Sequence, residues 1–279
     1  MKKKIFAVSD IHGEYEILIK GLKEAGFDED NPEHLLVSVG DAFDRGGNAL
    51  AVYEYLKRLS DKGSAIVLKG NHTGFFTGYL DGTILSPFNY YHNGTNETMA
   101  DFLHETAPFE MYCVLRKIDQ PTYGDFADWV SEARQEINEE FPELLEWLNT
   151  RPYYLETENY IFTHGAIDTN AKDWRKPHCE RYHFTDWDAL MWDDGSFFGK
   201  EINNTDKTVV IGHFGTATLR KMYGYSPNRN LKGSFDILKR KDGRVIAIDA
   251  TTNLSKKINV LIIESEEIIR CGIKKTKNG

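Results

Sequence analysis

The 279-residue sequence predicts an α/β fold with a functional site at one edge of a sheet. Two observations lead to this prediction. Over residues 1–75, short apolar runs alternate with amphipathic stretches in the order β-α-β-α-β. In addition, five apolar runs of the chain stop at an aspartate, asparagine or histidine. Because ligands of open α/β sheets bind at the carboxyl ends of strands, these residues indicate where the site lies.

Three strands and two crossover helices are expected in the first 75 residues. The helices cover residues 14–25 and 48–59, each with apolar residues at helical spacing and a glycine beyond its end. The segment 76–150 differs: its first part has the glycines, prolines and asparagines of irregular chain, and helical patterns follow over residues 97–104 and 123–148. Pro142 should break the second pattern into two helices.

We expect residues 76–150 to be a helical insertion packed beside the sheet, within a single domain of residues 1–279. After the insertion, β-type runs return. Short turns between them favour an antiparallel second sheet. These runs cover residues 160–163, 208–211, 234–238, 244–249 and 258–263.

Residues that bind metal ions stand at the five strand ends, namely Asp10 with His12, Asp41, Asn71, His164 and His213. Any one of them alone is more often a turn former or a helix N-cap, so only their joint occurrence favours a metal site. About thirty residues separate Asp10 from Asp41 and Asp41 from Asn71, which is the length of a strand–helix–strand unit. These three residues should therefore occupy equivalent tips of neighbouring parallel strands.

Such a donor set can hold two divalent ions. Two dications about 3.5–4 Å apart form a site for phosphoryl transfer if one carboxylate bridges them, and Asp41 on the central strand is the natural bridge. Asp10 and His12 lie two residues apart, on the same side of an extended segment, and can share one ion. Oxygen and imidazole donors suit Mn²⁺, our first choice, or Fe or Zn; no cysteine stands at these strand ends, which argues against structural zinc. The second ion is left with Asn71, His164 and His213.

Charge and composition exclude several classes of function. With 34 basic and 43 acidic residues the net charge is −9, which argues against a general binder of nucleic acid or of anionic membranes. A phosphate substrate stays compatible, because bound dications reverse the local field. No apolar stretch is long enough to span a bilayer. Three isolated cysteines, Cys113, Cys179 and Cys271, favour a reducing cytoplasm.

Five motifs together resemble the sequence blocks of the calcineurin-like metallophosphoesterases. The second ends in Asp-Arg-Gly, as in the serine/threonine phosphoprotein phosphatases and their bacterial relatives, which include symmetrical diadenosine tetraphosphatases. The resemblance implies a metallophosphatase β-sandwich of two mixed sheets flanked by helices, with a dinuclear centre at the sheet edge. The motifs are Asp10-Ile11-His12-Gly13, Gly40-Asp41-Ala42-Phe43-Asp44-Arg45-Gly46, Gly70-Asn71-His72, His164-Gly165-Ala166 and Gly212-His213.

Roles for individual residues follow from the resemblance. It implies that His72 is the general acid, that Asp44 orients it and that Arg45 binds phosphate oxygens. The simpler alternatives are a helix N-cap for Asp44 and a solvent-facing salt bridge for Arg45. The resemblance also implies two ligand sets: Asp10, His12 and Asp41 for metal 1, and Asp41, Asn71, His164 and His213 for metal 2.

Two positions depart from the family pattern. Thr73 stands where the third block usually has a glutamate. The second phosphate-binding arginine of the protein phosphatases is not found around residues 191–194, and Arg175 or Arg181 is our candidate to replace it. These departures concern the substrate more than the chemistry.

We therefore expect a cytoplasmic two-metal phosphatase that hydrolyses phosphomonoesters, with phosphoprotein Ser/Thr phosphate as substrate and a metal-bridging hydroxide as nucleophile. One alternative is hydrolysis of nucleotide polyphosphates, as in diadenosine tetraphosphatases, with aromatic residues of the insertion stacking on a base. Another is a metal-stabilised binding protein with little turnover. The sequence leaves the oligomeric state open. The aromatic residues in question are Phe88, Tyr90, Tyr91 and Trp129.

Overall fold

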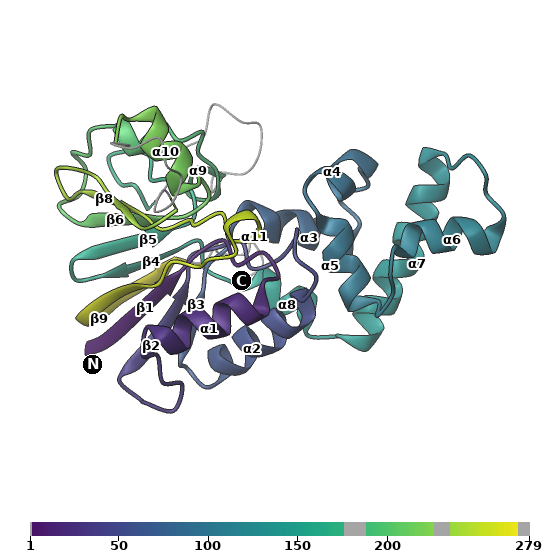
Figure 1. Ribbon diagram of the computed structural model, residues 1–279, viewed down its shortest axis with the longest axis horizontal. Coiled ribbons are helices and arrows are strands. Elements are labelled where there is room, and N and C mark those ends of the chain that lie inside the picture. Colours follow the sequence, from purple (N-terminus) through teal and green to yellow (C-terminus); the bar gives the residue numbers. More distant parts are fainter. Residues whose placement is uncertain (1, 176–187, 226–234, 273–279) are drawn as a thin grey trace.

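The computed structural model describes residues 2–175, 188–225 and 235–272 (Figure 1). Its first part is the expected β-α-β-α-β unit. Parallel strands β1 (Lys2–Val8), β2 (His34–Ser38) and β3 (Ala65–Val67) are connected by helices α1 (Tyr15–Glu24) and α2 (Ala49–Asp61). The register pairs Val8 with Ser38 and Ser38 with Val67, so the three strands end at one edge of the sheet.

The second part of the sheet is mixed and not antiparallel as expected. Its strands are β4 (Tyr154–Thr157), β5 (Tyr160–Thr163), β6 (Thr208–Ile211), β7 (Leu238–Lys239) and β8 (Val245–Ala247). Strands β5, β6 and β8 are parallel to one another, whereas β4 and β7 are antiparallel to their neighbours. The short turn before β8 correctly predicted one antiparallel pair, but crossover connections returned β6 and β8 to the direction of β5.

A single long strand joins the two parts. Strand β9 (Leu261–Gly272) pairs antiparallel with β1 through its first half and with β4 through its second half. The order β3-β2-β1-β9-β4-β5-β6-β8-β7 is thus one continuous hydrogen-bonded sheet. Both pairings of β9 contain a register shift, and Ser265 within it has a φ of 58°. Such irregularities bend a strand, which allows the two parts of the sheet to fold over one another.

Three apolar clusters show the layers. Ile5 and Ala7 of β1 pack with Phe162 of β5 and Val210 of β6 in a cluster between the two parts of the sheet. The alternate residues of each strand face outward, onto α1 and α2 on one side and onto α9 (Asp188–Met191) and α10 (Thr216–Met222) on the other. The result is the α/β/β/α sandwich that was expected.

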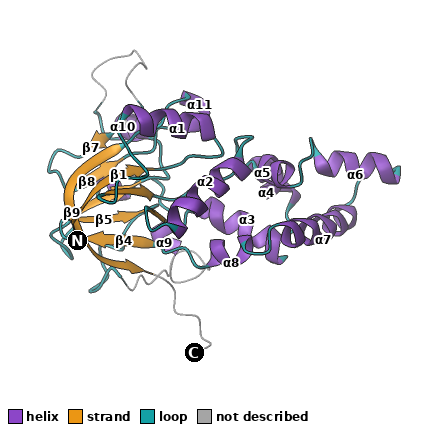
Figure 2. Cartoon of the chain, turned by 90° about the horizontal axis from the view of Figure 1, so that it is seen from below, coloured by secondary structure: helices purple, strands orange, loops and turns teal. Residues whose placement is uncertain are grey.

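The segment between β3 and β4 is helical throughout much of its length. Figure 2 shows α6 and α7 extending away from the sheet. Helices α7 and α8 flank Pro142, as predicted, but α3, α4 and α6 lie where no helix was expected. Helices α4 and α6 are short and begin with a proline, which favours the first turn of a helix yet reads in sequence as a breaker. The helices are α3 (Asn71–Asp81), α4 (Pro87–His92), α5 (Thr95–Phe102), α6 (Pro108–Arg116), α7 (Tyr123–Glu140) and α8 (Leu144–Asn149).

This helical insertion shares its core with the sheet. Phe102 of α5 lies against Phe43, beyond the end of β2, and against Phe76 of α3, at ring-centroid distances of 6.5 and 5.1 Å. The same apolar cluster continues to Phe6 and Val8 of β1. Two short elements complete the fold, the 3-10 turn Phe197–Gly199 and α11 (Thr252–Ser255). Among the described helices, none has the length and apolar character needed to cross a membrane.

Candidate metal centre

The carboxyl ends of five strands meet where the two parts of the sheet face each other. Asp10 follows β1, Asp41 follows β2, and Asn71 opens α3 just after β3. From the other part, His164 follows β5 and His213 follows β6. All of these side chains are buried except that of His213, which is half-buried. A bond between the His164 Nδ1–H and the carbonyl oxygen of Val39, 2.9 Å long, connects the two parts at this point.

Unusual backbone conformations direct these side chains inward. Asp10, His12, Asp41 and His213 have φ values of 52°, 48°, 49° and 63°. L-residues seldom adopt this left-handed region, although aspartate and histidine tolerate it better than most. Since such strain persists only where the surroundings enforce it, its concentration at the strand ends indicates a functional site.

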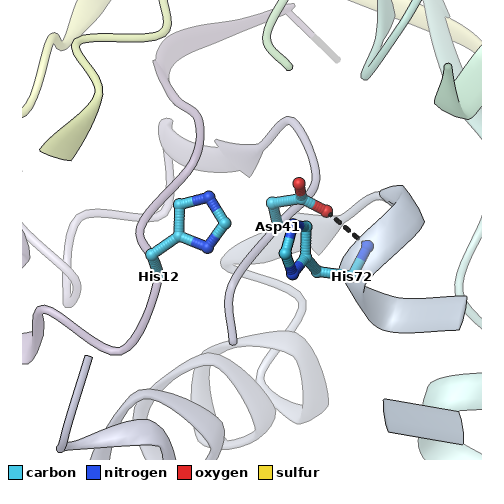
Figure 3. Close-up of side chains that lie close together, drawn as sticks. All are labelled: His12, Asp41 and His72. Atoms are coloured by element: carbon cyan, nitrogen blue, oxygen red, sulfur yellow. Dashed lines mark hydrogen bonds between the residues drawn. The ribbon is translucent and has the colours of Figure 1, made fainter. Parts of the chain in front are cut away.

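Two overlapping groups of side chains could each hold an ion. Ligand atoms of His12, Asp41 and His72 lie within 4.8 Å of one another, and so do those of Asp41, His164 and His213. Asp41 belongs to both groups, which is the position of a bridging carboxylate. Figure 3 shows the side chains of the first group close together, with a bond from the backbone N–H of His72 to Asp41 Oδ1, which is 3.0 Å long.

The remaining ligand candidates surround these groups. Asp10 Oδ1 is 3.8 Å from His12 Nε2, and Asp10 Oδ2 accepts a bond from the backbone N–H of His213. Asn71 Oδ1 is 3.1 Å from His164 Nε2. The structure therefore brings together all six residues that the sequence proposed as ligands, while geometry alone adds His72 as a seventh.

Backbone carbonyl groups fix the tautomers of two histidines. His12 Nδ1–H donates to the carbonyl oxygen of Phe43 at 2.8 Å, and His164 Nδ1–H donates to that of Val39. A carbonyl oxygen can only accept, so in each ring Nε2 carries the lone pair of the neutral form and points into the cluster. Metal-binding histidines are commonly oriented in this way by a partner at the other nitrogen.

Buried charge is the main electrostatic feature of the site. Burial, and next the neighbouring Asp249, raise the pKa of Asp10 well above its usual value. Burial also opposes ionisation of Asp41, but the surrounding His164 and His72 outweigh it and bring its pKa well below normal. Although burial lowers it, the pKa of His164 rises to about 9, because Asp41 and Asp10 lie beside it. Asp41 Oδ2 is 2.9 Å from His164 Nε2.

This arrangement fits a pair of divalent cations. Carboxylate and imidazole groups buried in one cluster are costly unless a compensating charge is bound. Oxygen donors mixed with imidazole, without a cysteine among the grouped residues, match the preferences of Mn, Fe or Zn. Asp249 is a further buried acid that the sequence analysis missed. The run 244–249 ends at this aspartate, which is the same signal that identified the other strand ends.

A buried hydrogen-bond network holds the His72 ring through its Nδ1 atom. His72 Nδ1 lies 2.7 Å from Asp44 Oδ2, and Asp44 is fully buried. Thr98 Oγ1 accepts the backbone N–H of Asp44 at 2.7 Å and donates to Asp44 Oδ1 at 3.0 Å. Thr95 Oγ1 donates to Asp44 Oδ2 at 3.1 Å. Both threonines belong to α5 of the insertion and were missed, because a pair of threonines on a helix carries no functional signal in sequence.

Arg45 lies across the entrance to the cluster. Its Nη1 is 3.0 Å from His12 Nε2, and its Nη2 is 2.9 Å from His72 Nε2. The insertion also holds this residue, since the backbone N–H of Arg45 donates to the carbonyl oxygen of Gly94. Gly94 has a φ of 80°, and a Cβ there would lie 2.5 Å from Arg45 N. Only glycine fits this close approach.

Of the two candidate replacements for a second phosphate-binding arginine, Arg175 is not brought to the cluster. Arg175 binds Glu156 of β4 and lies 3.2 Å from Asp173. Glu156 pairs with Ile161, near the start of β5, whereas His164 follows the other end. Arg181 lies outside the described residues.

Two further side chains shape the surroundings of the site. Thr73, at the position of the usual glutamate, accepts the backbone N–H of Gly70 and so caps α3. Trp192, which the sequence analysis did not single out, packs edge-on against His213 at 5.3 Å and against Phe75 at 5.8 Å. It is 40% exposed and forms an aromatic wall beside the metal groups.

A family model and several known proteins match this chain. The family model described as calcineurin-like phosphoesterase matches residues 3–248. Serine/threonine-protein phosphatase 2 of Salmonella typhimurium is 24% identical over 76% of the chain and 79% of its own length. The asymmetrical bis(5'-nucleosyl)-tetraphosphatase PrpE of Bacillus velezensis is 31% identical over 39% of the chain, and this match spans 45% of that relative.

Solved structures show the same fold. A putative diadenosine tetraphosphatase superposes with a TM-score of 0.51 at 14% identity, covering 98% of this chain and 95% of that one. A cold-active protein-tyrosine phosphatase from a Shewanella species gives 0.51 at 18% identity, covering 96% of this chain and 80% of that one. The family match over most of the sequence shows that the chain belongs to the calcineurin-like phosphoesterase family and is a phosphoric ester hydrolase.

Proposed function

We propose that this hydrolase removes phosphate from phosphorylated serine or threonine residues of proteins. The observation that carries the proposal is the position of Arg45, whose guanidinium spans His12 and His72 at the entrance to the metal groups. A planar guanidinium binds the oxygens of a terminal phosphoryl group in a charge-assisted, bidentate manner. The Salmonella typhimurium relative named a serine/threonine-protein phosphatase, aligned over 79% of its length, supports this substrate class.

Two metal ions, proposed to be Mn²⁺ with Fe or Zn as alternatives, would occupy the centre. Asp10, His12 and Asp41 would hold the first. When bound, such cations polarise phosphoryl oxygens. They also lower the pKa of water, so that hydroxide can attack phosphorus at neutral pH. The second would be held by Asp41, Asn71, His164 and His213.

The chain's own residues would carry the other steps. Arg45, whose guanidinium lies beside His12 and His72, would bind the phosphoryl oxygens. His72 would donate a proton from Nε2 to the departing serine oxygen, because an alkoxide is a poor leaving group. Asp44 accepts the Nδ1–H of His72 and fixes the orientation of the ring. Thr95 and Thr98 in turn hold the Asp44 carboxylate.

A second candidate function is hydrolysis of nucleotide polyphosphates. Two of the aromatic residues first considered for base stacking, Tyr90 and Trp129, are buried in the core at 0% and 4% exposure. Phe88 and Tyr91 are exposed, and Trp192 beside His213 could also stack on a base. The match to a tetraphosphatase, although it covers 45% of that relative, supports the same alternative.

The location of the protein in the cell stays a prediction from the sequence. We propose a cytoplasmic location because the three cysteines are isolated; of these, Cys113 and Cys271 are free.

The alternative of a metal-stabilised binding protein without turnover is less well supported. Among the described residues, a buried network joins His72, Asp44 and two threonines, and metal binding alone would not require it.

The role of His72 can be separated from that of a metal ligand. His72→Asn should keep both metals and lose at least about 10²-fold in kcat on a phosphoserine peptide, the usual size of a general-acid contribution. The loss should shrink on p-nitrophenyl phosphate, whose leaving group departs without a proton. His92→Asn, at an exposed position of α4, is the matched control. An equal loss on both substrates, or loss of metal, would show that His72 has another role.

Thr98 should matter through Asp44. Thr98→Val removes the partner of two Asp44 atoms and should lower stability by about 1–3 kcal/mol, the cost of leaving buried polar groups unpaired. Its kcat should fall about tenfold on the phosphoserine peptide and less on p-nitrophenyl phosphate, because the defect acts through the acid. Thr98→Ser keeps the hydroxyl and should behave like the wild type. Equal rate losses on the two substrates in Thr98→Val would point to general destabilisation instead.

The substrate class is tested by comparing the kcat/KM values for the substrates of the two candidate functions. Wild-type protein loaded with Mn²⁺ should hydrolyse a phosphoserine peptide with a kcat/KM at least about tenfold above that for diadenosine tetraphosphate, a ratio well within the range that binding contacts provide. Trp192→Ala should leave this order unchanged. A preference for the dinucleotide that disappears in Trp192→Ala would support the second candidate and overturn the first.

A further inference from the structure

A cavity of about 470 Å³ lies in the helical insertion, beside the loop that carries Arg45. Gly47 of that loop forms one wall, and Tyr90 of α4 forms another. The rest of the lining comes from α5, from the start of α6 and from residues 104–107 between these helices. Four of its residues are acids, namely Glu97, Asp101, Glu105 and Glu110.

The cavity is strongly negative. Among the described residues that line it, none is a lysine or an arginine, and its single histidine, His104, is already 3.0 Å from Glu140. Two of the acids have a structural partner: Asp101 accepts the backbone N–H of Leu50, and Glu110 accepts the hydroxyl of Tyr91. Glu97 and Glu105 thus contribute charge without a compensating cation among the lining residues.

Three lining residues also have a buried oxygen with no hydrogen-bond partner among the described residues. These are the hydroxyl of Tyr90, Asn96 Oδ1 and Glu97 Oε2. Tyr90 is fully buried, and burial, followed by the nearby Tyr91, Glu110 and Glu97, raises its pKa. A buried polar atom without a partner is costly and rare in folded proteins. Because two of these three oxygens can only accept, the matching ligand group is rich in N–H donors.

The acidic cavity lies close to the reaction site. Gly47 is two residues from Arg45, so their Cα atoms are at most about 7 Å apart. Helix α5 separates the two regions: Thr95 and Thr98 face Asp44, whereas Asn96 and Glu97 face the cavity. A helix with its side chains is about 10 Å wide, which an extended peptide spans in about three residues.

We propose that this acidic cavity binds the guanidinium or ammonium group of an arginine or lysine in the substrate, about three residues from the phosphorylated residue. The inference rests on the proposed phosphoprotein phosphatase function and extends it to sequence specificity. A phosphate at Arg45 and a cation in the cavity match the charge pattern of the molecule, positive at the catalytic entrance and negative beside it.

Paired phosphoserine peptides test the inference. The two members of each pair differ only in arginine or citrulline, which has the same shape without charge, at the third residue before or after phosphoserine. Wild-type kcat/KM should be about ten- to a hundredfold higher for the arginine member of one pair, as expected for charge-assisted hydrogen bonds. The preference should be lost in Glu97→Gln and reduced in Glu105→Gln, an exposed position that tolerates substitution.

Glu136→Gln is the matched control, since it removes the same charge from an exposed site of the insertion outside the cavity. It should keep the arginine preference, and all three variants should hydrolyse p-nitrophenyl phosphate at the wild-type rate. Equal hydrolysis of the arginine and citrulline peptides by the wild type would overturn the inference. So would a preference that survives in both Glu97→Gln and Glu105→Gln.

Calorimetry with free argininamide shows whether the cavity binds a small free cation as well as a cation of a peptide. It also tests the cavity independently of the proposed function. If neither peptide is hydrolysed while p-nitrophenyl phosphate is, the proposed function fails, and with it the peptide part of the inference. Argininamide binding that is lost in Glu97→Gln would then support a site for a small free cation. Absence of argininamide binding to the wild type would overturn the cavity as a cation site altogether.

Discussion

The structure depends on placing charged, metal-binding side chains together in a buried position. Asp41 is the centre of this arrangement, because it belongs to both ligand groups and contacts His164 from the opposite part of the sheet. Isolated charges would be expelled from such a site. They are retained here because strand ends in register, left-handed turns and carbonyl-bound imidazoles direct them to one point. The continuous sheet, joined through β9, holds the two contributing edges opposite each other.

The helical insertion contributes directly to the site. Thr95 and Thr98 of α5 complete the hydrogen bonding of Asp44, and Gly94 holds the backbone of Arg45. The His72–Asp44 pair and Arg45 are therefore supported by a segment that the family motifs do not include. The other face of the same helix lines the acidic cavity. One helix thus connects the residues proposed to orient the general acid with the surface proposed to select the substrate.

Much of this site could be predicted from the sequence because its signals are local. An apolar run that ends at Asp10 or Asp41 shows both the strand and the residue at its tip, and spacing of about thirty residues indicates parallel neighbours. Thr98 could not be found in this way, since it meets Asp44 only after the insertion folds, across 54 residues of chain. Asp249 gave the same local signal as the other strand ends and was overlooked.

Strand direction and length were harder to predict than strand position. The run at 208–211 was identified, but its parallel pairing with β5 is set by crossover connections and not by its own residues. The last strand continues to Gly272, beyond the predicted end at residue 263, because its second half is largely exposed and lacks a continuous apolar run. The irregularity at Ser265 that bends it has no recognisable signature in the sequence.

Elemental analysis of the metal bound per chain shows whether two ions share Asp41. We expect close to two transition-metal ions per chain in the wild type. Asp41→Asn should lose both, whereas Asp206→Asn, at an exposed loop position away from the two ligand groups, should keep both. A single tightly held ion in the wild type, or two ions retained in Asp41→Asn, would contradict the shared centre.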